Sequence, residues 1–322
     1  MLHIADGESV AGTLRQSGIP GIVSTYGDLM YEGPAPAGLD TQAWIETRAR
    51  FLADFHGVPL AEARQYMKAC EDTLASFSQH AEVVIWLSHT LSNQLILIKV
   101  LDWFSRRDLG SVKLSLICVG HFPGTDRFVG LGGLYADQLA SLADTRLPVG
   151  DAEYRTARAA WKAFTSPDPT EIERFLQTDT SALPFIVAAF RRHLEQFPSI
   201  DSGLSRTERQ ALSVLRDRGP LSAGPLFVAV RDLEEQVFMG DTSFYRIMAD
   251  LSEAPHPLVR ISDTFDNRLG EVSLAETGRR VLESHADHID LNGIDRWLGG
   301  VHLTGDKAAW RWDRTSERLV RL

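Results

Sequence analysis

The chain has 322 residues, of which 44% are hydrophobic and 24% are charged, and its formal net charge at pH 7 is −10. This composition is typical of a soluble globular protein with two or three domains. The negative charge argues against a general nucleic-acid coat, because non-specific binding depends on neutralising phosphates with basic side chains. The longest apolar stretch, Leu95 to Leu101, contains Lys99 and is too short to span a bilayer, so no membrane partner is expected.

Two further features of the sequence predict a cytoplasmic protein. Met1 begins directly on the first predicted strand, with no basic segment and apolar core of a signal peptide before it. The only cysteines are Cys70 and Cys118, which predict neither a disulfide framework nor a cysteine metal site.

Residues 1–146 alternate strands and helices. Strands are predicted at 2–5, 22–25, 82–88 and 112–120, and helices at 10–16, 44–55, 60–77, 94–104 and 136–143. The unbroken apolar runs "EVVIWLS" and "VKLSLICVG" are typical of central parallel strands covered on both faces. The order of elements therefore predicts an α/β fold, a Rossmann-like three-layer domain with a mostly parallel sheet.

The rest of the chain is predicted to form two further parts. Residues 147–200 are expected to be a helical linker segment, in which Asp151 caps one helix and "DPTE", 168–171, opens another. In residues 201–322, "SRTE" at 205–208 is a capping box that opens a helix over 206–218. Helices at 223–235 and 242–252, a β-hairpin and a closing helix then give the order of a winged-helix-like domain, followed by a terminal β-hairpin.

Several stretches of the chain resemble a bacterial family known as domain of unknown function 1835. They are "LHIADGESVAGTLRQSGIPG", "DLMYEGPAP", "VVIWLSHTLSNQLILIKVLDWF", "HLEQFPS", "GLSRTERQ" and "WLGGVHL". The family is uncharacterised, so the resemblance implies no activity. The segment after His89 is often more acidic in the family, whereas here it reads Thr90-Leu91-Ser92-Asn93.

Polar side chains follow each of the four predicted strands. Ligands of open α/β sheets bind outside the carboxyl ends of the strands, so we expect these side chains to face one crevice. The polar residues are Asp6, Glu8, Ser9, Asp28, Glu32, Ser88, His89, Asn93, Gln94, His121, Asp126 and Arg127, and the glycines Gly7 and Gly33 lie among them.

The turn between the first strand and helix has two interpretations. Ser9 either caps the helix or, with Gly7, Glu8 and the helix N-terminus, binds an anion. The turn lacks both the Gly-Lys-Ser/Thr ending of a P-loop and the Gly-x-Gly-x-x-Gly fingerprint of dinucleotide-binding proteins.

The residues proposed for catalysis are His89, Asp28 and Glu32. His89 ends a buried strand, where a histidine is a general base, a ligand anchor or a cap. Asp28 and Glu32 are either a carboxylate pair for acid–base chemistry or part of a solvated loop. Gln94 and His121 are proposed to bind the ligand. No motif such as His-Glu-x-x-His supports a metal, and the sequence names no cofactor.

The charge of the winged-helix-like domain disfavours DNA as a partner. Residues 201–322 contain 16 basic and 20 acidic residues, a net charge of −4, whereas binding in a DNA groove needs a positive face. A local basic patch near the wing would comprise Arg260, Arg268, Arg279 and Arg280. A protein-packing role is the alternative.

Three functions follow from these observations. The first is a cytoplasmic protein whose Rossmann-like domain binds a small anionic ligand such as a nucleotide; whether it is an enzyme, of hydrolase or transferase type, stays open. The second is a ligand-sensing transcription regulator with a winged-helix output domain. The third is a non-catalytic protein-interaction adaptor. The sequence does not specify the reaction, the substrate or the oligomeric state.

Overall fold

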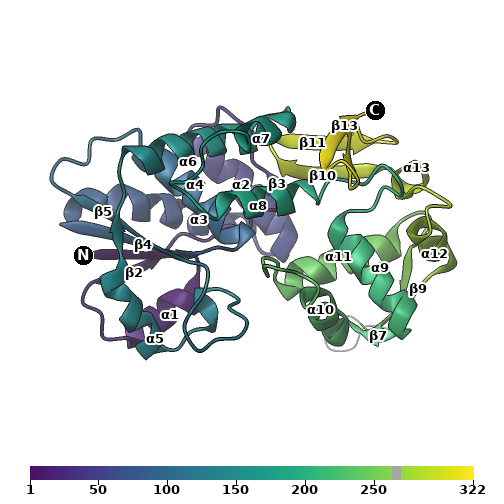
Figure 1. Cartoon of the computed structure of the whole chain (residues 1–322), viewed down its shortest axis with the longest axis horizontal. Helices are drawn as coiled ribbons and strands as arrows, with labels where there is room; N and C mark the ends of the chain where they lie inside the picture. Colours follow the sequence, from purple (N-terminus) through teal and green to yellow (C-terminus); the bar gives the residue numbers. More distant parts are fainter. Residues whose placement is uncertain (263–269) are drawn as a thin grey trace. The chain divides into compact units, whose positions relative to one another are not determined.

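A computed structural model describes residues 1–262 and 270–322, and the contacts among them divide the chain into two compact units. Unit 1 comprises residues 1–190 and 299–301, and unit 2 comprises residues 191–298 and 302–322. Both are drawn in Figure 1, and each is described by itself. Residues 147–190 fall within unit 1, while the domain limits predicted at 146 and 200 stay predictions.

Unit 1 contains a five-stranded sheet in the order β2-β1-β4-β5-β6. Its strands are β1 (Leu2–Ala5), β2 (Ile22–Thr25), β4 (Glu82–Ser88), β5 (Lys113–Val119) and β6 (Leu147–Pro148), and the short β3 (Gly33–Pro34) lies outside it. The first four pair in parallel, which confirms the predicted arrangement. The edge strand β6 pairs antiparallel with β5 and was not predicted, because a two-residue strand has no periodic pattern.

Helices cover both faces of this sheet. The helices of this part of the chain are α1 (Glu8–Gln16), α2 (Thr41–His56), α3 (Leu60–Ala75), α4 (Leu91–Phe104), α5 (Ala136–Leu142), α6 (Asp151–Phe164), α7 (Thr170–Phe175) and α8 (Ile186–Leu194), which continues into unit 2, with 3-10 turns at Ser76–Gln79, Leu131–Gly133 and Ala143–Thr145. Figure 1 shows α1 and α5 below the sheet and α3, α4 and α6 above it. Strand β4 is therefore covered on both faces, as its unbroken apolar sequence predicts.

The core between the sheet and helices α1 and α5 contains alternate residues of β4. Val84 and Trp86 are fully buried there, against Val10 and Leu14 of α1. The one polar atom of the Trp86 side chain, Nε1, donates to Nδ1 of His3 over 3.0 Å. Burying such side chains stabilises the fold by about 1.5–3 kcal/mol each.

The chain direction across the sheet reverses between β1 and β4. From β1 the chain crosses through α1 to β2 on one side, and from β4 it crosses through α4 to β5 on the other. Helices α1 and α4 lie on opposite faces (Figure 1), so their N-termini flank the carboxyl ends of two adjacent strands. This is the switch point at which α/β proteins bind ligands.

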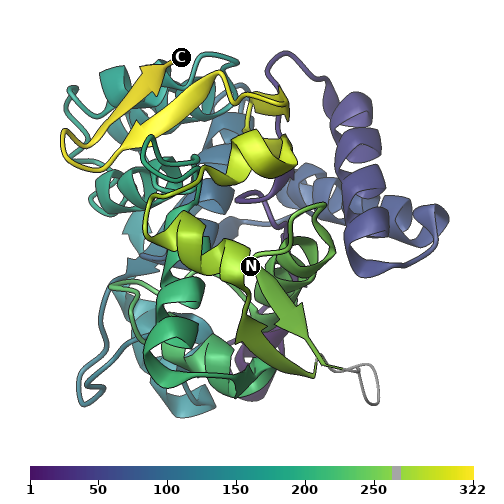
Figure 2. The same cartoon turned by 90° about the vertical axis from the view of Figure 1, so that its right-hand side faces the viewer.

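Unit 2 begins with helices and continues into small antiparallel sheets. Its elements are α9 (Arg206–Arg218), β7 (Leu221–Ser222), α10 (Ala223–Arg231), α11 (Asp241–Glu253), β8 (Val259–Ile261), β9 (Glu271–Leu274), α12 (Glu276–Leu282), α13 (His288–Asn292), β10 (Ile294–Gly299), β11 (Val301–Gly305), β12 (Trp310–Asp313) and β13 (Arg318–Arg321). Strands β7, β9 and β8 form a three-stranded antiparallel sheet, and β8 and β9 are seen side by side in Figure 2. Strands β12 and β13 pair antiparallel.

The predicted helix starts are right at one position and wrong at another. The capping box of α9 is confirmed, since Glu208 N–H donates to Ser205 Oγ and Ser205 N–H donates to Glu208 Oε2. Asp151 is the first residue of α6 and not its cap. The cap is Gly150, whose N–H donates to the Glu153 carboxylate over 2.8 Å.

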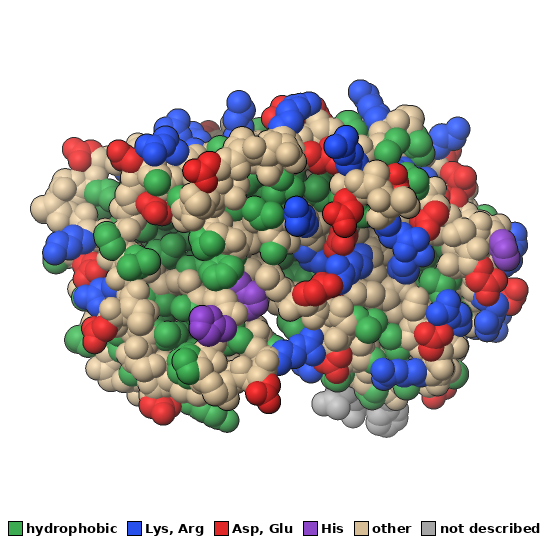
Figure 3. Space-filling model, in the orientation of Figure 1, with side chains coloured by type: hydrophobic (Ala, Val, Ile, Leu, Met, Phe, Trp, Pro, Cys, Tyr) green, Lys and Arg blue, Asp and Glu red, His purple; other side chains and the backbone are tan. Residues whose placement is uncertain are grey.

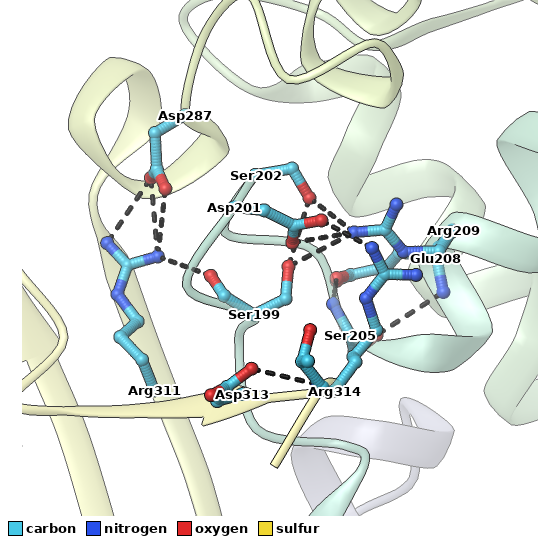
Figure 4. Close-up of polar contacts among 11 residues, drawn as sticks. Ser199, Asp201, Ser202, Ser205, Glu208, Arg209, Asp287, Arg311, Asp313 and Arg314 are labelled. Carbon is cyan, nitrogen blue, oxygen red and sulfur yellow. Dashed lines mark hydrogen bonds and ion pairs between the residues drawn. The ribbon is translucent and has the colours of Figure 1, made fainter. Parts of the chain in front are cut away.

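A cluster of serines, arginines and carboxylates holds together the first part of unit 2 (Figure 4). Arg209 donates to Ser199 Oγ at 3.2 Å, to Ser202 Oγ at 2.8 Å and to Asp201 at 3.0 Å. Arg311, which is 2% exposed, forms an ion pair of 3.1 Å with Asp287. Arg209 and Arg311 therefore form ion pairs with carboxylates of the same unit.

None of the helices in residues 1–262 and 270–322 has an apolar stretch long enough to cross a membrane.

Candidate functional site

The turn between β1 and α1 leaves the N-terminus of the helix without a side-chain cap. Helix α1 begins at Glu8, and its N-cap is Gly7, with φ and ψ both at 175°. Ser9 is thus the second residue of the helix, and the interpretation of Ser9 as the cap is wrong, because its position lies inside the first turn. The N–H groups of a first turn have no partners within the helix, so those of Glu8, Ser9 and Val10 are donors at the end of β1.

A second set of polar atoms joins the ends of β1 and β4. The Asn93 side chain, 5% exposed in the first turn of α4, donates from Nδ2 to Asp6 Oδ2 over 2.6 Å. Its Oδ1 accepts from the N–H of Ser88 at 2.8 Å and from Ser88 Oγ at 3.0 Å. Thr90 caps α4 and fixes its first turn, since its hydroxyl accepts from the Asn93 N–H.

Burial raises the pKa of Asp6, although the hydrogen bond from Asn93 opposes this effect. Carboxylates with a raised pKa are concentrated at functional sites. Asp6 therefore has the environment of a functional carboxylate.

Gln94 lies at the same end of the sheet, between β4 and β5. Its Nε2 donates to the Ser88 carbonyl at 2.8 Å and to Cys118 Sγ at 3.3 Å. Gln94 is 0% exposed, and within the described residues its Oε1 has no hydrogen-bond partner. A buried acceptor without a partner is unusual in a protein and points to a water or a ligand.

His89 follows Ser88 directly and is held by aromatic rings. It stacks on Phe128, with ring centroids 5.6 Å apart, and it meets Phe185 edge-on at 6.1 Å. His89 is 6% exposed, and burial lowers its pKa, partly offset by the carbonyl of Val119. Burial therefore favours the neutral form of the imidazole.

The glycine-rich loop that follows β5 returns over the same strand ends. A Cβ atom on Gly130, whose φ is +114°, would lie 3.2 Å from Ser88 Oγ. A Cβ atom on Gly132 would lie 3.4 Å from Ser9 Oγ. Glycine allows this close approach of the backbone, so the loop lies directly against both the α1 turn and the end of β4.

Asp28 and Glu32 are joined to Arg48 and not, within the described contacts, to Asp6 or His89. Arg48 donates to both oxygens of the Asp28 carboxylate, at 2.6 to 3.1 Å, and both side chains are fully buried. Arg48 also donates to the backbone carbonyl of Glu32 at 3.0 Å. The geometry gives Asp28 a structural role in fixing its loop, and a catalytic role for Asp28 or Glu32 stays a prediction.

The other proposed residues divide into two groups. Gly7, Glu8, Ser9, His89 and Gln94 lie around the ends of β1 and β4, as the sequence predicts. His121 is exposed in the loop after β5, and its role in ligand binding stays a prediction.

Asp6, Ser88 and Asn93 belong to the polar set expected at the strand ends, but the sequence did not single them out for catalysis or binding. Ser88 and Asn93 are ordinary polar residues in a strand–helix turn, and only the pairing of β4 with β1 places them beside Asp6. Their signal was their position after a central strand.

Within the described residues, no group of three or more His, Cys, Asp or Glu side chains is arranged to hold a metal ion. On the face of the molecule drawn in Figure 3, histidine and hydrophobic side chains lie side by side in unit 1.

No family model matches the chain, and no curated protein matches it significantly.

Proposed function

We propose that unit 1 binds a small anionic ligand, such as a nucleotide, at the carboxyl ends of β1 and β4. The observation that carries this proposal is the hydrogen bond between Asp6 and Asn93, which joins two strand ends where the chain direction across the sheet reverses. Such a position is the usual ligand site of an open α/β sheet. We also propose that the chain is related to domain of unknown function 1835, which its sequence resembles.

The anionic group is proposed to lie at the N-terminus of α1. The first-turn N–H groups of Glu8, Ser9 and Val10 are donors, and the helix dipole favours a negative charge there. Gly132 lies against the same turn, and its lack of a side chain leaves room for a ligand oxygen. The Gln94 acceptor without a partner is an independent sign that a ligand or a water belongs at this edge.

If the protein is a hydrolase or a transferase, Asp6 and His89 are the proposed acid–base groups. Burial shifts the pKa of Asp6 upward and that of His89 downward, so the two values approach each other. Titratable groups whose pKa values are shifted by burial are concentrated at active sites.

A proline substitution tests the anion site directly. Glu8→Pro removes one N–H donor from the first helical position, where proline is well tolerated. Gly7, which precedes it, already has the extended backbone that a residue before proline requires. The matched control is Glu8→Ala, which keeps the N–H and removes the exposed carboxylate that pairs with Arg15.

Calorimetric titration with inorganic phosphate is the measurement. We expect Glu8→Ala to bind phosphate at least as tightly as the original chain, because a nearby negative charge is lost, and Glu8→Pro to bind about tenfold more weakly than Glu8→Ala. Equal binding by the two variants, or no binding by the original chain, would contradict the proposal.

A second candidate function is favoured by the order of elements in unit 2. Three helices, α9 to α11, precede β8, β9 and the closing helix α12, and the sheet is antiparallel. We propose this as a winged-helix-like module, so the chain is alternatively a ligand-sensing transcription regulator or a protein-interaction adaptor. Helix α11 would be the reading helix, and its Arg246 lies 3.6 Å from Asp250, which weakens the case for DNA.

Binding of the full chain to duplex DNA at physiological salt separates these alternatives. Arg260, Arg279 and Arg280 are exposed, whereas Arg268 lies outside the described residues. Figure 3 shows basic and acidic side chains interspersed on the drawn face of unit 2. Weak, salt-sensitive binding is expected; sub-micromolar binding that is lost when Arg279 and Arg280 are both replaced by alanine would favour the regulator.

A further inference from the structure

Asp6 and Gln94 supply hydrogen-bond acceptors at this site. Asp6 is ionised above its raised pKa and carries several lone pairs, and the described contacts give its side chain one side-chain donor, Asn93 Nδ2. The Gln94 amide is oriented by its hydrogen bonds to Ser88 and Cys118, and this orientation leaves Oε1 as a buried acceptor without a partner among the described residues. Carboxylate and amide oxygens are satisfied by O–H or N–H donors.

Asp6 lies close to the proposed anion site at the N-terminus of α1. Asp6 is two residues before Glu8, the first residue of α1, so the Cα atoms of these residues are at most about 7 Å apart. A free phosphate at the helix N-terminus would bring a second negative charge close to Asp6, and like charges at such a distance repel. A ligand that also places an uncharged donor against Asp6 satisfies the carboxylate with a hydrogen bond, which offsets part of this repulsion.

We propose that the ligand carries hydroxyl groups beside its anionic group, as a sugar phosphate or the ribose phosphate of a nucleotide does, and that Asp6 accepts a hydrogen bond from one of these hydroxyls. This inference rests on the proposed function, since the phosphate occupies the N-terminus of α1. Asp6 is then a specificity-determining residue that selects hydroxylated phosphate esters over simple ones.

The test compares two phosphate monoesters of the same charge, ribose 5-phosphate and methyl phosphate, by calorimetric titration. The proteins are the original chain, Asp6→Asn and the control Asp137→Asn, which replaces an exposed carboxylate on α5. Asparagine at position 6 keeps an oxygen to accept from Asn93 and loses the charge. Thermal unfolding of each variant checks that it is folded.

We expect the original chain and Asp137→Asn to bind ribose 5-phosphate roughly tenfold more tightly than methyl phosphate, because a hydrogen bond to a charged acceptor is among the stronger ones. Asp6→Asn is expected to lose this preference while binding methyl phosphate at least as tightly as before, because a negative charge near the phosphate is removed. Equal affinity of the original chain for the two esters, or an unchanged preference in Asp6→Asn, would overturn this inference but leave the proposed function intact. Failure of both esters to bind would overturn the proposed function and the inference with it.

Discussion

Asn93 Nδ2 lies 2.6 Å from Asp6 Oδ2, so one hydrogen bond joins side chains that are 87 positions apart in the sequence. The contact exists because β1 and β4 are parallel neighbours, with Ala5 opposite Trp86. It ties the turn before α1 to the first turn of α4, and the two helices lie on opposite faces of the sheet (Figure 1). The candidate site is therefore built on rigid strand ends.

The Asn93 side chain is expected to matter for stability. Asn93→Ala leaves the buried N–H and hydroxyl of Ser88 without their acceptor, which costs about 1–3 kcal/mol. Ser88→Ala removes only the hydroxyl and keeps the N–H bond, so its cost should be smaller, about 1 kcal/mol. Urea unfolding of both variants measures the difference; a larger loss for Ser88→Ala would contradict this ranking.

The carboxylate of Asp6 is expected to lower stability at neutral pH. Because its pKa is raised in the folded state, the folded chain binds more protons than the unfolded chain as pH rises above the ordinary aspartate value of 3.8. The contribution of Asp6 to stability therefore falls from that pH up to its folded pKa and stays low above it. Asp6→Asn should have a higher melting temperature than the original chain at pH 7. Its melting temperature should also fall less as the pH rises through this range, which thermal unfolding at several pH values measures. A lower melting temperature at pH 7 would contradict the assignment.

Asp28 and Arg48 are expected to act together in folding. Asp28→Asn leaves a fully buried guanidinium without its carboxylate, and breaking such a pair costs about 3–5 kcal/mol. Replacing both residues, with Asp28→Leu and Arg48→Met, should recover part of this loss because no buried charge remains. Denaturant unfolding compares the variants. A stable Asp28→Asn variant with impaired ligand binding would instead favour the catalytic role predicted from the sequence.

The glycines of the loop after β5 are expected to differ in how well they tolerate substitution by alanine. Gly130→Ala places a Cβ at a φ of +114° and 3.2 Å from Ser88 Oγ, so it should destabilise the chain by more than about 1 kcal/mol. Gly132→Ala has ordinary contacts, the nearest at 3.4 Å from Ser9 Oγ, and should leave stability nearly unchanged while weakening phosphate binding. Unfolding and calorimetry are measured on both. Loss of stability in Gly132→Ala with intact binding would place the ligand elsewhere.

Both cysteines are expected to be unreactive in the folded chain. Burial raises the pKa of Cys118 to about 11 and that of Cys70 to about 11, so almost none of either thiol is ionised at pH 8. Ellman's reagent should report slow reaction before unfolding and two thiols after unfolding in guanidinium. Rapid reaction of Cys118 in the folded chain would show that the end of β5 opens readily.

The sequence predicted the parallel sheet well, because apolar runs such as "EVVIWLS" identify buried strands without reference to their neighbours. It also predicted that Glu8, Ser9, His89 and Gln94 would gather at the ends of strands. It did not predict the buried ion pair between Asp28 and Arg48, since Arg48 lies 20 positions away on helix α2, whose sequence contains many polar residues. Long-range pairing of buried charges leaves no local pattern. The cap of α1 was misjudged for a related reason, because a helix start shifted by two residues changes which side chain is the cap.

An amide NMR titration with inorganic phosphate tests the central claim most directly. The first-turn N–H groups of α1 are proposed to donate to the anion, so the resonances of Glu8, Ser9 and Val10 should show the largest shifts, with smaller shifts at Gly132. The same titration of Glu8→Pro should lose most of the response. Shifts confined to unit 2, or no shift in the first turn of α1 at phosphate concentrations that saturate binding, would contradict an anion site at the ends of β1 and β4.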